Sequence, residues 1–226
     1  MKNYSAFDIL GPIMIGPSSS HTAGAARLAK IAATIAPNEI REVRFLLHGS
    51  FAKTYKGHGT DRALVAGILG MDPWDEDLRD SLNIAKEKKL EFTFEEADLG
   101  EVHPNTVKFI MKSDNGVISE VTGSSVGGGN ILIFDVDGQR VEFTGEYPTL
   151  IITHLDVPGM IHKVSTLLYN EDINIAFMNV YRSAKGSEAF MVVETDGKVE
   201  SGVIDKIKEL GNIKNIEEII PPTKGE

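Results

Sequence analysis

The sequence predicts an α+β fold, with a mixed α/β part followed by a smaller part of the order βαββαβ. Two observations predict it. Residues 149–219 alternate short β-rich runs with two stretches of apolar residues at helical spacing. The N-terminal part places alanine-rich helical segments ahead of several strands, and Asp-Asn-Gly and Asp-Gly turns separate the later ones. We therefore expect two domains, 1–147 and 148–226.

The C-terminal domain has the clearer pattern. Strands are predicted at 149–155, 173–182, 189–194 and 213–219, and helices at 160–170 and 200–210. Turns are predicted at 156–159 and 184–187. This order is that of a ferredoxin-like sandwich, in which two helices cover one face of an antiparallel sheet.

The N-terminal domain mixes both kinds of element. Helices are predicted from Thr22 to Ala36 and from about Asp61 onward. Strands are predicted at 43–47, 90–94 and 106–111, and hairpin turns at 114–116 and 137–138.

Composition excludes several classes of function. The 226 residues carry a net charge of −10, which argues against a nucleic-acid or anionic-membrane partner. No run of 18 apolar residues exists and the N-terminus lacks a signal-peptide core, so we expect a cytoplasmic protein. Cysteine is absent, which excludes disulfides, thiol nucleophiles and any cluster held by thiolates of this chain. No metal-ligand spacing occurs.

The first candidate site precedes the first predicted helix. Four hydroxyls and an imidazole occupy a single turn there, at Ser18, Ser19, Ser20, His21 and Thr22. One hydroxyl is enough to cap a helix, and plain capping remains an alternative. A helix N-terminus with free amides and several small donors also suits a carboxylate or phosphate.

The second candidate site has a similar arrangement. Its residues are Gly57, His58, Gly59, Thr60 and Asp61, with Thr60 as the expected helix cap. The flanking glycines allow a ligand to approach closely. A helix N-terminus disfavours the imidazolium, so both histidines are expected to be neutral and able to act as bases. The alternative is two surface loops with incidental histidines.

A glycine run forms the third candidate. Gly127, Gly128 and Gly129 precede Asn130 and either form a nest of amides around an anion or mark a bent strand. No Gly-Lys-Ser/Thr follows, so the run is not a P-loop. The segment 103–106, HPNT, is a turn entering a strand and is a second candidate edge of an active site.

These segments together resemble a known family. IGPSSSHTAGAARLA (15–29), HGSFAKTYKGHGTDRALVAGILG (48–70), HPNT (103–106) and SVGGGNI (125–131) resemble, in the same order, the β subunit of iron–sulfur-dependent L-serine dehydratase (L-serine ammonia-lyase). Residues 149–219 resemble the ACT domain that ends this subunit in two-chain members of the family.

The resemblance implies a partner and a cofactor. A [4Fe–4S] cluster would be carried by an α subunit, which fits a chain without cysteine. An open iron of that cluster would act as Lewis acid on the substrate L-serine. The resemblance also implies that this chain alone is inert.

The same resemblance implies roles for the candidate residues. His58 would be the base and His21 a proton relay or a group that orients the substrate, although the sequence does not decide which histidine has which role. Ser18, Ser19, Ser20 and Thr22 would bind the carboxylate of serine. The remaining substrate-binding candidates are Gly57, Gly59, Thr60, Asp61, Gly128, Gly129 and Asn130.

In the ACT domain the turn at 156–159 corresponds to the position where related domains bind amino acids at a dimer interface. The regulatory candidates are Asp156, Pro158, Gly159, Met160, Ile161 and Asn174, with Asn179 beside them on the same strand. A homodimer contact through this domain is expected. A structural turn without ligand is the alternative.

Two other functions stay open. The N-terminal domain is also similar to the regulatory domain of some phosphoglycerate dehydrogenases, in which case the chain is a serine sensor. A dimerisation scaffold without ligand is the third reading. The histidine pair favours the lyase, because only a lyase needs a base.

Overall fold

The computed structural model describes residues 13–182 and 184–221. The chain divides into two compact units, the first ending at Gly138 and the second beginning at Gln139. The predicted boundary between 147 and 148 lies in the connection between β6 (Gln139–Phe143) and β7 (Thr149–Leu155). The N-terminus, where no signal peptide is predicted, falls outside the described residues. No helix of the described part is long and apolar enough to cross a membrane.

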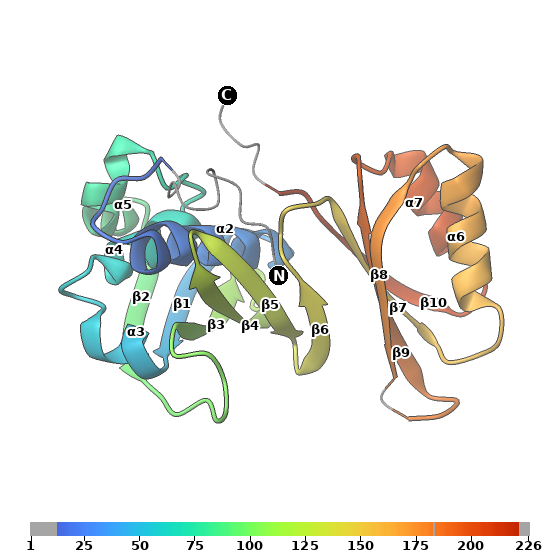
Figure 1. Cartoon of the computed structure of the whole chain (residues 1–226), viewed down its shortest axis with the longest axis horizontal. Helices are drawn as coiled ribbons and strands as arrows, with labels where there is room; N and C mark the ends of the chain where they lie inside the picture. Colours follow the sequence, from blue (N-terminus) through green and yellow to red (C-terminus); the bar gives the residue numbers. More distant parts are fainter. Residues whose placement is uncertain (1–12, 183, 222–226) are drawn as a thin grey trace, which may run out of the picture. The chain divides into compact units, whose positions relative to one another are not determined.

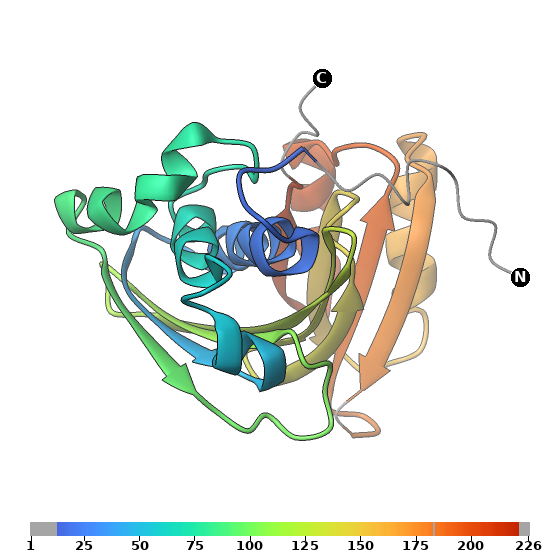
Figure 2. The same cartoon turned by 60° about the vertical axis from the view of Figure 1, so that its left-hand side comes forward.

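The first unit is built on a curved sheet whose strands β1 to β5 run in the order β2-β1-β3-β4-β5 (Figure 2). The strands are β1 (Ile40–Leu47), β2 (Glu91–Glu96), β3 (Thr106–Ser113), β4 (Ile118–Gly127) and β5 (Asn130–Val136). β1 and β2 are parallel, and the other pairs among these five strands are antiparallel. The strands predicted at 43–47, 90–94 and 106–111 are therefore confirmed.

Two helices, α2 (Ala25–Ile35) and α4 (Thr60–Ile68), lie side by side on the concave face of this sheet (Figure 2). Their close packing depends on small residues. A Cβ at Gly67 would stand 2.3 Å from the carbonyl oxygen of Ala26, so no larger residue fits at this crossing without movement. The crossing fixes the start of α4 beside the segment that leads into α2.

The start of the first helix and the cap of the second need correction, whereas the start predicted at about Asp61 agrees with α4, which begins at Thr60. The helix predicted from Thr22 begins only at Ala25, because Ser19–Gly24 forms a wider π-helical turn, η1. Its polar side chains hydrogen-bond locally, which competes with regular α-helix. Thr60 does not cap α4. The N-cap residue is Gly59, with φ +70°, and the Thr60 hydroxyl is buried without a partner among the described residues.

Three short helices and one hairpin were not predicted. The helices are α3 (Gly49–Thr54), η2 (Glu76–Asp80) and α5 (Ser81–Glu87), each too short for a clear periodic pattern. Gly127, Gly128 and Gly129 all have positive φ and turn the chain from β4 to β5. The predicted turn at 137–138 separates β5 from β6, and both of its residues have positive φ, as a two-residue hairpin of type I′ requires.

The second unit confirms the ferredoxin-like prediction. After β7, its elements are α6 (Met160–Asn170), β8 (Ile175–Arg182), β9 (Glu188–Thr195), α7 (Ser201–Lys208) and β10 (Ile213–Ile219). The sheet order is β10-β7-β9-β8, with every pair antiparallel. Both helices lie on one face of this sheet (Figure 1).

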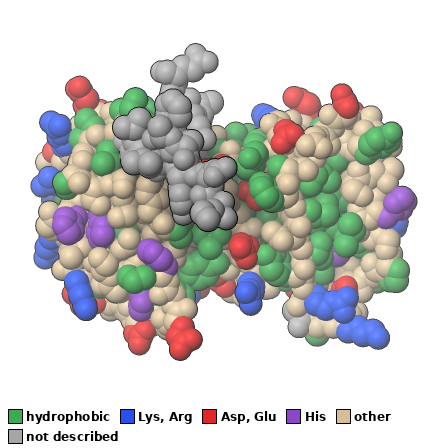
Figure 3. Space-filling view, in the orientation of Figure 1, with side chains coloured by type: hydrophobic (Ala, Val, Ile, Leu, Met, Phe, Trp, Pro, Cys, Tyr) green, Lys and Arg blue, Asp and Glu red, His purple; other side chains and the backbone are tan. Residues whose placement is uncertain are grey.

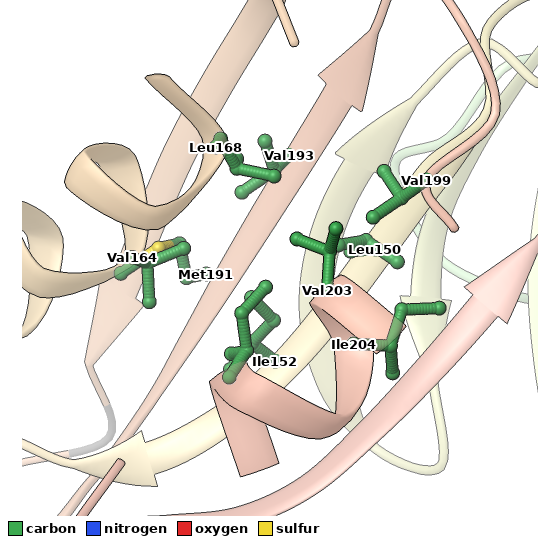
Figure 4. Packing of buried hydrophobic residues seen from close by; sticks show 10 residues of the cluster. Leu150, Ile152, Val164, Leu168, Met191, Val193, Val199, Val203 and Ile204 are labelled. Carbon is green, nitrogen blue, oxygen red and sulfur yellow. The ribbon is translucent and has the colours of Figure 1, made fainter. Parts of the chain in front are cut away.

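The core of this unit lies between that face and the helices. Val164 and Leu168 of α6 point toward Met191 and Val193 of β9, and Val203 of α7 lies beside Leu150 of β7 (Figure 4). Each of these side chains is at most 5% exposed. Full burial of such a side chain is worth roughly 1.5–3 kcal/mol.

Candidate active site

The serine-rich segment holds His21 within the π-helical turn η1. Ser18 is the N-cap residue, and its hydroxyl oxygen accepts the backbone N–H of His21 at 3.2 Å. Thr22 is buried, and its hydroxyl donates to the carbonyl oxygen of His58 at 3.5 Å. Single π-type turns inserted into helices are frequent at functional sites. The turn therefore links the two predicted histidine segments through Thr22.

The His21 ring has hydroxyl partners on both sides. Its Nδ1 lies 3.1 Å from the hydroxyl of Ser20 and 3.4 Å from that of Ser18. Its Nε2 lies 3.1 Å from the hydroxyl of Ser50, at the start of α3. The ring also meets the edge of Phe51, with centroids 5.3 Å apart. Ser19 makes no side-chain hydrogen bond with the described residues, so only two of the three serines hold the ring.

His58 is exposed and stands beside His21, with ring centroids 4.9 Å apart. Its backbone N–H donates to Thr54, at the end of α3. Gly59 takes φ +70° with open space around it, and Gly57 is exposed, so neither flanking residue screens the His58 ring. No hydrogen bond from the His58 ring to the described residues is present. The structure thus brings the two predicted histidines together, one enclosed and one accessible.

Burial controls the charge of the site. It lowers the pKa of His21, and the positive charge that His58 can carry lowers it further. The cause differs from the predicted helix dipole, because His21 lies inside its turn rather than before a helix. Burial also raises the pKa of the half-buried Asp61, against the positive charges of Arg62 and Lys56. His21 is therefore held neutral near pH 7.

The HPNT segment (103–106) holds the start of α3, which carries Ser50. The backbone N–H of Ser50 donates to the carbonyl oxygen of Pro104 at 2.8 Å, and that of His48 donates to Thr106 at 3.0 Å. Gly49, with φ +57°, packs so closely that a Cβ would lie 2.7 Å from the Pro104 oxygen. Two motifs noted in the sequence, HGS and HPNT, therefore meet at Ser50, which was not among the predicted site residues.

The β4–β5 hairpin flanks the same turn. Ser125, in β4, packs against Gly24, where a Cβ would lie 2.0 Å from the Ser125 hydroxyl. Arg27 of α2 donates to the carbonyl oxygen of Gly129 at 2.7 Å. Gly128 and Asn130 are exposed and make no hydrogen bond with either histidine. The glycine run thus lies at the margin of the site and forms a hairpin turn.

A cavity of about 240 Å³ opens beside His58. Its wall includes Thr22 and Gly59, together with the guanidinium-bearing residues Arg62 and Arg79. Neither arginine was predicted as a site residue, because the sequence places them after the motif on unremarkable helical positions. Figure 3 shows histidine side chains gathered on one face of this unit. The region offers an exposed base beside a small, positively charged recess.

The described residues 13–182 and 184–221 contain no group of three or more histidine, aspartate or glutamate side chains placed to hold a metal ion. The full sequence has no cysteine to bind iron as thiolate. An iron–sulfur cluster therefore does not fit the donor set of this chain.

The predicted regulatory turn lines a separate cavity of about 880 Å³ in the second unit. Asp156, Pro158, Gly159, Met160 and Ile161 all line it. Also on its wall, and not predicted, are His154, His162, Val180, Arg182, Lys185 and Gly186.

The carboxylate of Asp156 is already engaged in this cavity. It accepts the backbone N–H of Gly186 at 3.1 Å and pairs with Arg182 at 3.4 Å. Asn174 lies outside the cavity. It directly precedes β8, at the end of that strand away from Arg182, and its side chain donates to Asp196 at 2.7 Å. Asn179 is exposed on β8 and is also not part of the wall.

Two family models match the chain. Residues 5–135 match the serine dehydratase beta chain, and residues 149–212 match the ACT domain. This chain belongs to the serine dehydratase beta chain family. The resemblance found in the sequence is confirmed, and so is the order of a serine dehydratase beta fold followed by an ACT fold.

Two curated relatives are similar in sequence to this chain over most of its length. The chain is 45% identical over 197 residues to the L-serine dehydratase beta chain of Peptoniphilus asaccharolyticus, covering 87% of this chain and 89% of that one. It is 40% identical over 219 residues to the probable L-serine dehydratase beta chain of Bacillus subtilis, covering 97% and 99%. A D-3-phosphoglycerate dehydrogenase of Methanocaldococcus jannaschii is 31% identical over 195 residues, covering 84% of this chain but 36% of that protein.

Proposed function

We propose that this chain is the β subunit of an iron–sulfur-dependent L-serine ammonia-lyase and that His58 is its base. One observation carries the choice of base. Both ring nitrogens of His21 are engaged by hydroxyls, whereas the exposed ring of His58 has no hydrogen-bond partner among the described residues. A base must reach the proton that it removes, so the accessible histidine is the better candidate.

The proposed reaction has three steps: elimination, tautomerisation and hydrolysis. His58 takes the α-proton of L-serine and returns a proton to the departing β-hydroxyl, which leaves as water, so that aminoacrylate forms and His58 is neutral again. Aminoacrylate tautomerises to the imine, and water hydrolyses the imine to pyruvate and ammonia. A [4Fe–4S] cluster held by an α subunit would supply Lewis acidity toward the hydroxyl, since this chain has no cysteine.

The other candidates have supporting roles in this proposal. Ser19 and the backbone amides of Ser19 and Ser20 bind the carboxylate, assisted by the hydroxyls of Ser18 and Ser20, which also hold His21. Thr22 does not take part, because its amide donates to Ser18 and its buried hydroxyl donates to His58. Gly57 and Gly59 leave room for the substrate. Thr60 and Asp61 shape the wall behind His58, and Gly128, Gly129 and Asn130 form a margin that the α subunit covers.

The cavity at Asp156 is proposed as a regulatory amino-acid site. Arg182 and Lys185 suit a carboxylate, and the engaged Asp156 holds the loop around Gly186 in place. We further propose that two copies pair through the second unit, where the edge strand β8 exposes Phe177 and Val180. Light scattering on the purified chain tests the dimer.

A serine sensor is the second candidate function. The similarity to a D-3-phosphoglycerate dehydrogenase over 84% of this chain favours it. A sensor needs donors and acceptors but no base, so it would tolerate loss of the His58 imidazole. The lyase would not.

The deciding experiment is anaerobic co-purification of this chain with a reconstituted α subunit, followed by an assay of pyruvate from L-serine. The wild type is expected to turn over, and His58→Ala to assemble but lose turnover by about 10²–10⁴-fold. Glu87→Ala, at an exposed position of α5, is the control. Near-normal turnover by His58→Ala would transfer the role of base to His21. Binding of serine without assembly or turnover would favour the sensor.

A further inference from the structure

A run of hydrogen bonds surrounds His21, and one member of it has a fixed direction. The backbone N–H of His21 can only donate, and it donates to the Ser18 hydroxyl oxygen at 3.2 Å. The Ser18 hydrogen is then available for the Ser20 hydroxyl or for Nδ1 of His21, both at 3.4 Å. The Ser20 hydroxyl lies 3.1 Å from the same Nδ1. A hydroxyl hydrogen directed at Nδ1 satisfies either route, and in that arrangement Nδ1 is the acceptor.

The other ring nitrogen must carry the proton. A neutral imidazole has one N–H and one lone pair, so an accepting Nδ1 leaves the hydrogen on Nε2. That nitrogen lies 3.1 Å from the Ser50 hydroxyl, which is the acceptor. The Ser50 oxygen is 29 positions away in sequence and belongs to a different helix. The ring is thus held from both sides by separate elements.

Ser50 itself is held rigidly. Its N–H is bonded to Pro104, and its carbonyl oxygen accepts the hydroxyl of Thr54 at 2.8 Å. Gly49 adopts positive φ directly against Pro104, so the start of α3 has little freedom to shift. A fixed acceptor of this kind orients a histidine more precisely than a mobile side chain does.

We propose that Ser50 is a positioning residue that locks His21 as the neutral Nε2–H tautomer, so that His58 alone takes up the substrate proton. The two ring centroids stand 4.9 Å apart, so the orientation in which Ser50 holds the His21 ring decides which part of that ring faces His58. Phe51 fixes the tilt of the ring at its edge. Ser50 does not touch the substrate in this arrangement, and its effect passes through His21. The kinetic part of this inference rests on the proposed function, whereas the tautomer does not.

The first test uses the whole chain without a partner. The six histidines are labelled with ¹⁵N, and His21 is assigned by its absence in His21→Phe. In wild type we expect His21 Nε2 to show the shift of a protonated nitrogen and Nδ1 that of an unprotonated one. Ser50→Ala should mix the two tautomers, and Ser50→Thr, which keeps the hydroxyl, should restore the wild-type pattern. Ser124→Ala removes another buried hydroxyl, bonded to Thr106, and should leave the pattern unchanged.

The second test uses the assembled enzyme. Ser50→Ala should lower kcat by about fivefold with KM changed less than about twofold, because one hydrogen bond that orients the site is worth about 1 kcal/mol, which corresponds to that factor. Ser50→Thr should recover most of kcat, and Ser124→Ala should behave as wild type. A wild-type tautomer pattern in Ser50→Ala would overturn the inference whatever the kinetics. A locked tautomer in a chain that supports no turnover would refute the proposed lyase and leave Ser50 as the residue that positions His21.

Discussion

The histidine turn in the first unit and the Asp156 turn in the second are both loops that lead into a helix, yet they are built differently. His21 is held by Ser18 and Ser20 from its own turn and by Ser50 from a distant helix. The cavity at Asp156 is lined by one turn with its helix and by the β8–β9 hairpin beside it. The first site depends on several close packings between remote segments. The second depends mainly on local chain geometry.

Glycine substitutions test this difference most strongly. Gly49→Ala is expected to lower the free energy of unfolding by about 3 kcal/mol, because positive φ strain adds to a clash with Pro104. Gly159→Ala also meets positive φ but has open space, so about 1 kcal/mol is expected. Chemical denaturation followed by circular dichroism measures both. Equal losses would show that packing adds nothing at Gly49.

The contact between Gly24 and Ser125 gives the next largest effect. A Cβ at Gly24 would lie 2.0 Å from the Ser125 hydroxyl, so Gly24→Ala should cost about 2 kcal/mol. Adding Ser125→Gly should restore most of that loss, since it removes the clashing side chain. Gly202→Ala, in open space on α7, is the control and should not destabilise. If adding Ser125→Gly did not restore the stability lost in Gly24→Ala, the loss would come from a shift of the whole turn η1 and not from the clash with Ser125.

Asp156→Ala should have a smaller effect on stability. It removes the acceptor of the Gly186 N–H and the partner of the exposed Arg182, together worth about 1 kcal/mol. Thermal unfolding measures the loss. Asp205→Ala, which breaks the exposed pair with Lys208, should change stability by only about 0.3 kcal/mol. A loss as large as that of Gly49→Ala would contradict the local character of the second site.

The pH dependence of the first unit follows from His21. Its pKa in the folded chain lies below the ordinary 6.5, so the unfolded chain binds more protons as pH falls. This contribution to stability is present above pH 6.5 and is lost as pH falls through the folded pKa. His21→Phe should flatten the fall of the melting temperature below pH 6.5, and His162→Phe should not. An unchanged slope in His21→Phe would refute the burial argument.

The second unit should respond with the opposite sign through Glu194. Burial raises the pKa of this carboxyl, although the N–H and hydroxyl of Thr144 oppose the shift. The folded chain therefore binds the proton more tightly, and this contribution, present below the ordinary pKa of 4.5, is lost as pH rises through the folded pKa. Glu194→Gln should raise the melting temperature slightly at pH 7 and not at pH 4. The exposed Glu209→Gln should change neither.

Sequence patterns predicted the second unit better than the first because its elements follow regular periodicity. The bounds of α6 and β10 match the predicted ranges, and Val164 and Leu168 carry the apolar spacing that buries them. In the first unit the same reasoning missed η1, where local hydrogen bonds of Ser18 and Ser20 replace regular helix. It also assigned the cap of α4 to Thr60, although Gly59 reaches the positive φ that the turn needs.

The sequence by itself determined the family, the two folded parts, the two histidines and the absence of thiolate ligands, because residue identity, spacing and periodicity express these locally. Only the tertiary structure decided that His21 is enclosed and His58 exposed, that Ser50 completes the ring's hydrogen bonds, and that Asp156 is already paired. These features depend on which distant segments the packed glycines at 24, 49 and 67 allow to approach. Burial and hydrogen-bond geometry arise only once those segments meet.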